Sequence, residues 1–435
     1  MSAEFPKPSE LSPSALNGSN NDVWNDEQRE LHRERLGNQN DFNSPDAALP
    51  PNGSGSRNQA ILKKVGIVAL LGAWVVFNLY KFDYVVILPG GTDVVNERIT
   101  IKATAANTSG AASIPAGVAP KTYPAQGKLM WATVGVKNDV RGLDLLMGWL
   151  KGDSDVFKRE LLYGKANPKE AAQQSRDEMD DAKSVSKVLA ARRLGIATLE
   201  GGAEVLDREK GRPVEKLLAN GELIVAADGK SICLSGDLRE LMLTKKRGDT
   251  VSLTVQSAPE PGTTATGTVN SGAAGVTGTP ASKPVERTVV VPLHEVKGIK
   301  RQLMGVILGP SKSRPCRLPF ELEVNTDRIG GPSAGLAMTL AVLDRLSPGE
   351  LTGGGKVAAT GTIEADGSVG QVGGVKQKTA SVRASGAKLF LVPIEEVALA
   401  KPHAGKMQVV GVRNLDEALA ALRKAGGDPL PSPSR

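Results

Sequence analysis

The stretch Gly330–Gly335, which reads GGPSAG, constrains the fold of this chain more than any other. Residues 334–347 carry apolar side chains at helical spacing, so a helix is expected to begin where the glycines end. Pro332 fits the first turn of a helix, because its missing N–H costs nothing there. Ser333 would then lie at the positive end of a helix dipole, and the amides of Gly331–Ala334 are suited to hold an oxyanion. The plainer alternative is that Ser333 only caps the helix.

A second helix is predicted over residues 375–385, and its geometry singles out one lysine. At 100° per residue, Lys378 lies between Val375 and Val382 on the apolar face, whereas Lys376 lies on the opposite, solvated face. Burial disfavours an ammonium and lowers its pKa, and a neutral lysine can act as general base for a serine nucleophile. The alternative is a lysine whose amine reaches solvent from a partly apolar face.

Four stretches between Gly330 and Pro393 carry a family resemblance: GGPSAGLAMTLAVLDRL, LTGG, ATGTIEADGSVGQVGGVKQK and SGAKLFLVP. They resemble the proteolytic domain of the Lon proteases. The resemblance implies that Ser333 is the nucleophile, that Lys378 is its partner, and that Thr360 lies near the active site. We expect the Thr360 hydroxyl to hydrogen-bond the lysine and orient it. Many ATP-dependent relatives carry an acidic residue where this chain has Gly330, and this departure disfavours their mode of self-regulation.

The sequence contains no G-x-x-x-x-G-K-[ST] run, so we expect proteolysis without ATP. The nearest lookalike, residues 353–356, lacks the first glycine and is followed by Val357. Cys233 and Cys316 fall in different predicted domains and show no metal-ligand spacing, so no metal or other cofactor is expected. Whether these two cysteines form a disulfide stays open at this point.

A length of 435 residues suggests two or three domains, and 40% hydrophobic residues are enough for their cores. The net charge of +7 comes from scattered basic residues without an aromatic-basic stripe, which disfavours a nucleic-acid partner.

The N-terminal part is predicted as a tail followed by a membrane anchor. Residues 1–60 are polar and aperiodic, as expected of a disordered cytoplasmic tail. Residues 65–80 form an uncharged apolar run of about 24 Å as a helix, short of the bilayer core of about 30 Å. Lysines at both ends extend this run, so we expect residues 61–82 to cross the membrane once and contact its lipid. A buried core helix is the alternative. Three basic residues before the run (Arg57, Lys63 and Lys64) against two after it (Lys81 and Arg98) slightly favour the rest of the chain outside the cytoplasm. This orientation rests mainly on the resemblance to membrane proteins given below.

Residues 83–182 mix strand-like and helical runs and form an extracytoplasmic α/β region. Residues 183–257 resemble a PDZ domain of the protease-associated type, which would bind an extended peptide at a sheet edge. Together with the anchor and the Lon-like part, the chain resembles actinobacterial and Bacillus-type membrane proteins that combine these domains. A small α/β domain without a ligand is the alternative for residues 183–257.

Residues 258–286 are almost all Gly, Thr, Ala, Pro and Ser, which predicts a flexible linker. Strands resume after it, so residues 287–426 are assigned to the Lon-type α/β proteolytic domain and residues 427–435 to a frayed tail. The predicted fold class is therefore α+β and multidomain.

The sequence favours a membrane-anchored, ATP-independent serine endopeptidase that acts on protein or peptide substrates. A Ser-His-Asp triad is disfavoured because neither His294 nor His403 lies in a glycine-rich or acidic motif. A membrane-anchored PDZ adaptor that only binds peptides is the main alternative, and a soluble esterase or amidase is a third. The resemblance also implies a homo-oligomer, because Lon-type domains commonly form rings.

Overall fold

The structure is a computed structural model that describes residues 55–103, 120–164, 167–199, 201–257, 285–295, 302–311, 313–327 and 329–431. The chain divides into two units, residues 1–71 and residues 72–435, which are considered separately.

Helix α2 runs from Gly55 to Leu79. The prediction of a disordered tail over residues 1–60 is therefore wrong for residues 55–60, which are helical, and its remainder lies outside the described residues. Most of the apolar side chains from Val65 to Tyr80 are exposed. Within the described part of the chain, no helix combines the length and the apolar character needed to cross a membrane.

The described part of the second unit contains two six-stranded sheets. The one with more residues in its strands, called the larger sheet, has the order β18-β17-β14-β3-β1-β4. Its central strands β3, β14, β17 and β18 pair in parallel, while β1 pairs antiparallel with both β3 and β4. The strands are β1 (Tyr84–Val94), β3 (Lys128–Lys137), β4 (Asp155–Lys158), β14 (Lys356–Ala359), β17 (Leu389–Pro393) and β18 (Gln408–Val412).

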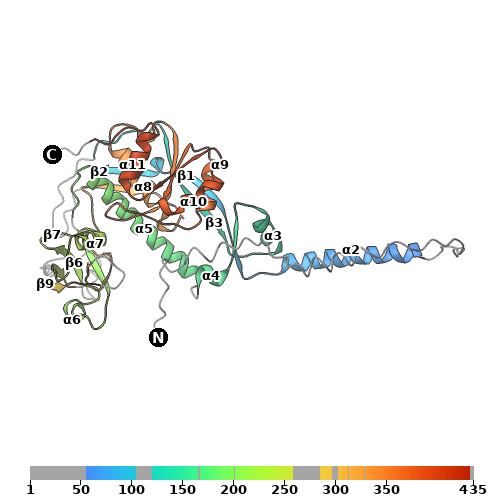
Figure 1. The fold of residues 1–435 in the computed structure, drawn as a ribbon, viewed down its shortest axis with the longest axis horizontal. Helices are drawn as coiled ribbons and strands as arrows, with labels where there is room; N and C mark the ends of the chain where they lie inside the picture. Colours follow the sequence, from blue (N-terminus) through green and yellow to red (C-terminus); the bar gives the residue numbers. More distant parts are fainter. Residues whose placement is uncertain are drawn as a thin grey trace, which may run out of the picture. The chain divides into compact units, whose positions relative to one another are not determined.

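Helices cover both faces of this sheet, as Figure 1 shows around β1 and β3. Side chains alternate along β3, so that Leu129 and Trp131 join one core while Met130 and Ala132 join the other. The first core is shared with α5 (Pro168–Arg193), α8 (Gly335–Leu346) and α11 (Leu415–Lys424), and the second with α9 (Val375–Ala384) and α10 (Val397–Ala400). The helices predicted behind the serine turn and around Lys378 are thus α8 and α9.

A second sheet has the order β12-β5-β6-β8-β9, with β7 paired to β6, and a core of its own. Its elements are β5 (Ala203–Arg208), α6 (Val214–Leu217), β6 (Leu223–Ala227), β7 (Lys230–Ser231), α7 (Ser235–Leu243), β8 (Thr250–Gln256), β9 (Glu286–Pro292) and β12 (Val306–Pro310). We refer to residues 203–310 with this sheet as the smaller lobe.

The sheets cut across the domain boundaries predicted from the sequence. β9 and β12 were assigned to the proteolytic domain but complete the smaller lobe. Conversely, β1, β3 and β4 come from the region 83–182 yet build the larger sheet. The boundaries were drawn from composition, whereas strand pairing joins segments that are distant in sequence. The predicted linker falls almost entirely outside the described residues.

Short elements complete the second unit. They are η3 (Asn96–Arg98), β2 (Ile99–Ala103), α3 (Gly142–Leu150), α4 (Arg159–Tyr163), β10 (His294–Glu295), β11 (Gln302–Leu303), β13 (Phe320–Val324), η4 (Pro332–Ala334), β15 (Thr362–Ile363), β16 (Val369–Gly370), η5 (Ile394–Glu396) and η6 (Lys401–His403). Together with the two large sheets, they give the mixed helix-and-strand α+β class that the sequence predicts.

Cys233 and Cys316 form a disulfide with their Cα atoms 5.1 Å apart. Cys233 lies two residues before α7 in the smaller lobe, and Cys316 precedes β13, which pairs with β2. The sequence left open whether these two cysteines pair. The structure shows that they do, across a sequence separation of 83 residues.

Candidate active site

Ser333 lies in the single turn of η4, directly before α8. The turn depends on Gly331, whose φ of 85° is in the left-handed region that glycine tolerates best. Its N–H donates to the carbonyl oxygen of Ser175 on α5 at 2.7 Å. The expectation that the Gly331 amide helps to hold an oxyanion is therefore wrong, because this amide is already engaged. Pro332 has no N–H. Of the amides from Gly331 to Ala334, those of Ser333 and Ala334 therefore remain as the ones expected to hold an oxyanion.

Thr360 follows β14 and fastens the serine turn to the sheet. Its hydroxyl donates to the backbone carbonyl of Ser333 at 3.2 Å, and the Gly361 N–H donates to the same oxygen at 2.9 Å. The Gly361 carbonyl in turn accepts the N–H of Leu336 in α8. The sequence suggested that Thr360 orients the lysine, but this hydrogen bond orients the backbone of the serine.

Lys378 lies in the first turn of α9, and only 3% of it is exposed. The helix begins after Gly374, which has a left-handed φ of 69°. Burial lowers the pKa of the Lys378 amine from 10.5 to about 8, and the carboxylate of Glu396 opposes this change. The inward orientation predicted from helical spacing is confirmed by this burial.

Ser333 and Lys378 line the same cleft, which has a volume of about 590 Å³. Gly331 and Ala334 also line it, together with side chains of β3 and the loop of residues 371–374. An alcohol and a largely buried amine thus share one cleft at the edge where α8 and α9 begin. This combination can transfer a proton from a nucleophile to a base without a metal ion.

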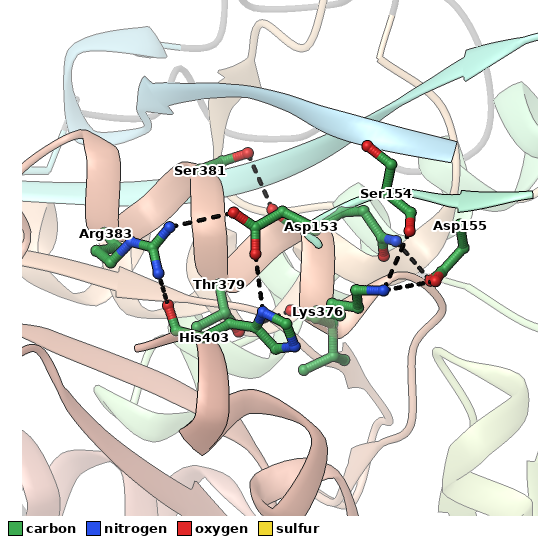
Figure 2. Close-up of polar contacts among 10 residues, drawn as sticks. Asp153, Ser154, Asp155, Lys376, Thr379, Ser381, Arg383 and His403 are labelled. Carbon is green, nitrogen blue, oxygen red and sulfur yellow. Dashed lines mark hydrogen bonds and ion pairs between the residues drawn. The ribbon is translucent and has the colours of Figure 1, made fainter. Parts of the chain in front are cut away.

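Lys376, two residues before Lys378, has a different environment. Its Nζ donates to Asp155 Oδ1 at 2.6 Å, and Gln377 Nε2 donates to the other oxygen of the same carboxylate at 2.6 Å. Figure 2 shows Lys376 and Asp155 directed toward one another. The prediction of a solvated lysine is wrong to this extent: Lys376 is half-buried and holds α9 against the start of β4.

The two histidines in the described part of the chain, His294 and His403, are engaged elsewhere. His403 Nδ1 is 2.8 Å from Asp153 Oδ1, and Arg383 bonds both the Asp153 carboxylate and the His403 carbonyl (Figure 2). His294 pairs with Glu209 in the smaller lobe. Neither ring lines the cleft that holds Ser333. The geometry therefore gives no support to a serine-histidine triad.

The geometry thus brings a serine at the start of one helix and a buried lysine at the start of another into one cleft. Residues 327–423 match the family model of the Lon protease (S16) C-terminal proteolytic domain. A stretch of 101 residues is 39% identical to a Lon protease of Clostridioides difficile (strain 630), covering 22% of this chain and 13% of that protein. These matches support a peptidase of the serine type for this part of the chain.

A solved structure is also similar: the PDZ domain of an SdrC-like protein from Listeria innocua. The identity is 20%, and the match covers 25% of this chain and 92% of that one, with a TM-score of 0.17. At that score the likeness supports no statement about the fold of the smaller lobe.

Two contributors to the site were missed at the level of sequence. Ser175 acts through its backbone carbonyl, which no sequence pattern reveals. Glu396 is a buried acid that bonds the Val372 N–H of the cleft wall at 2.8 Å. Glu396 directly follows Glu395 in the sequence. Composition gives no signal that Glu396 is buried while Glu395 is exposed.

Proposed function

We propose that this protein is an ATP-independent serine endopeptidase of the Lon type that uses Ser333 and Lys378. The observation that carries the proposal is the shared cleft, in which the serine turn meets a lysine whose amine is buried and has a pKa of about 8. The match of residues 327–423 to the Lon proteolytic domain supports the same chemistry.

The reaction follows from the roles of the two side chains. The neutral Lys378 amine removes the proton of the Ser333 hydroxyl while the Ser333 oxygen attacks the scissile carbonyl. The negative charge on the carbonyl oxygen is stabilised by the amides of Ser333 and Ala334 at the start of α8. Lys378 then returns its proton to the leaving amine. Water later hydrolyses the acyl-enzyme through the same base.

Protein or peptide substrates are proposed, with the smaller lobe binding an extended segment in the manner of a PDZ domain. The support is the sequence pattern of residues 183–257 and a sheet that presents β12 and β9 as its outer strands. An added peptide strand gains main-chain hydrogen bonds at such an edge.

We also propose three properties of the whole chain. The first is membrane attachment through residues 61–82, the second an extracytoplasmic active site, and the third a homo-oligomer. The exposed apolar side chains of α2 support the first. The disulfide between Cys233 and Cys316 supports the second, because disulfides persist in oxidising compartments.

The proposed function is tested by incubating the full chain with an unfolded protein in the absence of ATP and identifying new fragments by mass spectrometry. Ser333→Ala and Lys378→Ala should each abolish cleavage, with losses on the order of 10³-fold or more. Lys376→Ala is the matched control, since this neighbouring lysine is paired with Asp155 outside the cleft, and it should retain most of the activity.

Three results would contradict the proposal. Cleavage that survives Ser333→Ala would place the nucleophile elsewhere, and cleavage that survives Lys378→Ala would place the base elsewhere. No cleavage by the parent chain, combined with binding of the same unfolded protein, would favour the adaptor that only binds peptides.

A further inference from the structure

Glu396 is a buried acid behind the cleft. It ends the short turn η5, which follows β17, and 7% of it is exposed, while the adjacent Glu395 lies on the surface. Removing a carboxylate from water is costly unless hydrogen bonds or an opposite charge compensate it. The two glutamates are thus chemically identical neighbours in opposite environments.

One carboxylate oxygen of Glu396 is fixed to the wall of the cleft. Its Oε1 accepts the N–H of Val372 at 2.8 Å, and Val372 lines the cleft together with Ser333 and Lys378. Its Oε2 is buried and has no hydrogen-bond partner within the described part of the chain. A nearby positive charge can compensate the burial of an oxygen that has no hydrogen-bond partner.

The positive charge that acts on Glu396 is the ammonium of Lys378. Burial raises the pKa of the Glu396 carboxyl to about 7, the Val372 N–H and the Lys378 ammonium lower it, and Glu395 raises it. The neighbouring elements α10 and β18, which also pack against η5, contain no charged residue. The interaction is mutual, because the Glu396 carboxylate raises the pKa of Lys378 against the effect of burial.

We propose that Glu396 is a positioning residue of the Ser333–Lys378 site: anchored to the cleft wall through Val372, its carboxylate stabilises the ammonium that Lys378 becomes on accepting the Ser333 proton. This inference rests on the proposed function. The proton passes from the Ser333 oxygen to Lys378 Nζ and on to the leaving amine, so Glu396 changes no bond itself. It sets how readily the amine accepts the proton and at which pH the amine is free.

The test compares the pH dependence of cleavage by the full chain, Glu396→Gln and Glu395→Gln, from about pH 6 to about pH 10. Gln at position 396 keeps the shape and can accept the Val372 N–H but carries no charge. Without the Glu396 carboxylate the charged form of Lys378 is less favoured, so its pKa falls. The acid limb of the pH–rate profile should therefore move to lower pH by on the order of one unit. The maximal rate should fall about tenfold, because a weaker base accepts the serine proton less readily. Glu395→Gln removes an exposed carboxylate with the smallest effect on the pKa of Glu396, so its acid limb and its maximal rate should stay close to those of the parent.

A second readout does not depend on activity. Urea unfolding at about pH 7.5 is compared for the parent, Glu396→Gln, Lys378→Met and the double variant. Each single change leaves one buried charge without its partner, whereas the double change removes both charges. The double variant should therefore be less destabilised than the two single effects added together.

The outcomes separate this inference from the proposed function. If the parent cleaves and Ser333→Ala does not, an acid limb unmoved in Glu396→Gln overturns the role of Glu396 while the endopeptidase stands. If the parent does not cleave, the proposed function fails, and the unfolding cycle still decides whether the two buried charges interact. Additive stability changes would overturn the inference in either case.

Discussion

The lowered pKa of Lys378 follows from its position in α9. The helix turns the lysine toward the sheet, where water is largely excluded, and the neutral amine becomes accessible near physiological pH. Lys376 is only two residues away, but it lies on another face of the helix and pairs with Asp155 instead. The difference between the two lysines follows from helical geometry alone, which is why the sequence could distinguish them.

The Lys378 pKa of about 8 predicts the direction of the pH dependence. Lys378 is protonated and unable to act as base below this value, so cleavage should fall about tenfold for each pH unit below it and level off above it. The measurement is kcat/KM on a peptide substrate across the pH range. An acid limb well below pH 8 would show that a group other than Lys378 acts as the base.

At the scale of elements, the site depends on where α8 and α9 begin. Both starts were predicted correctly, because glycines and a proline mark helix ends locally and apolar spacing marks the buried face. The contacts that fasten these starts were not predictable. The carbonyls and amides of Ser175 and Gly361 that hold the serine turn belong to the backbone and carry no residue-specific signal.

Gly374 is predicted to be essential for the start of α9. Its φ of 69° is left-handed, and an added Cβ would come within 2.6 Å of Val134 Cγ1. Gly374→Ala should therefore cost about 1–2 kcal/mol or more and misplace Lys378, so that activity falls with stability. Gly373→Ala is the matched control, because its Cβ would meet no atom within 4 Å. Urea unfolding and cleavage rates measure both, and equal effects of the two substitutions would contradict this account.

At the scale of the whole molecule, the sequence predicted which segments form elements but not how strands pair across the chain. The larger sheet joins β1, β3 and β4 to β14 and β17, which lie roughly two hundred to three hundred residues later in the sequence. A resemblance confined to residues 330–393 could not reveal that these early strands complete the sheet. The same limit explains why β9 and β12 were assigned to the proteolytic domain, although they pair with strands of the smaller lobe.

The disulfide is predicted to stabilise the second unit. Cys233 and Cys316 close a long loop, and such links contribute about 2–5 kcal/mol to the free energy of unfolding. Thermal unfolding of the full chain should shift to lower temperature when a reductant is added. The variant Cys233→Ser/Cys316→Ser should already unfold at the lower temperature and show no response to reductant. An unchanged transition in the parent would show that the link contributes little.

The most direct test of the central claim is covalent labelling of Ser333. A fluorophosphonate reacts with a serine whose hydroxyl is deprotonated by a neighbouring base, and mass spectrometry of the digested full chain locates the modified residue. We predict one label at Ser333, formed at normal rate in Lys376→Ala and strongly slowed in Lys378→Ala. Equal labelling of Ser333 in Lys378→Ala, or labelling of another serine in the parent, would contradict the claim that these two residues form the active site.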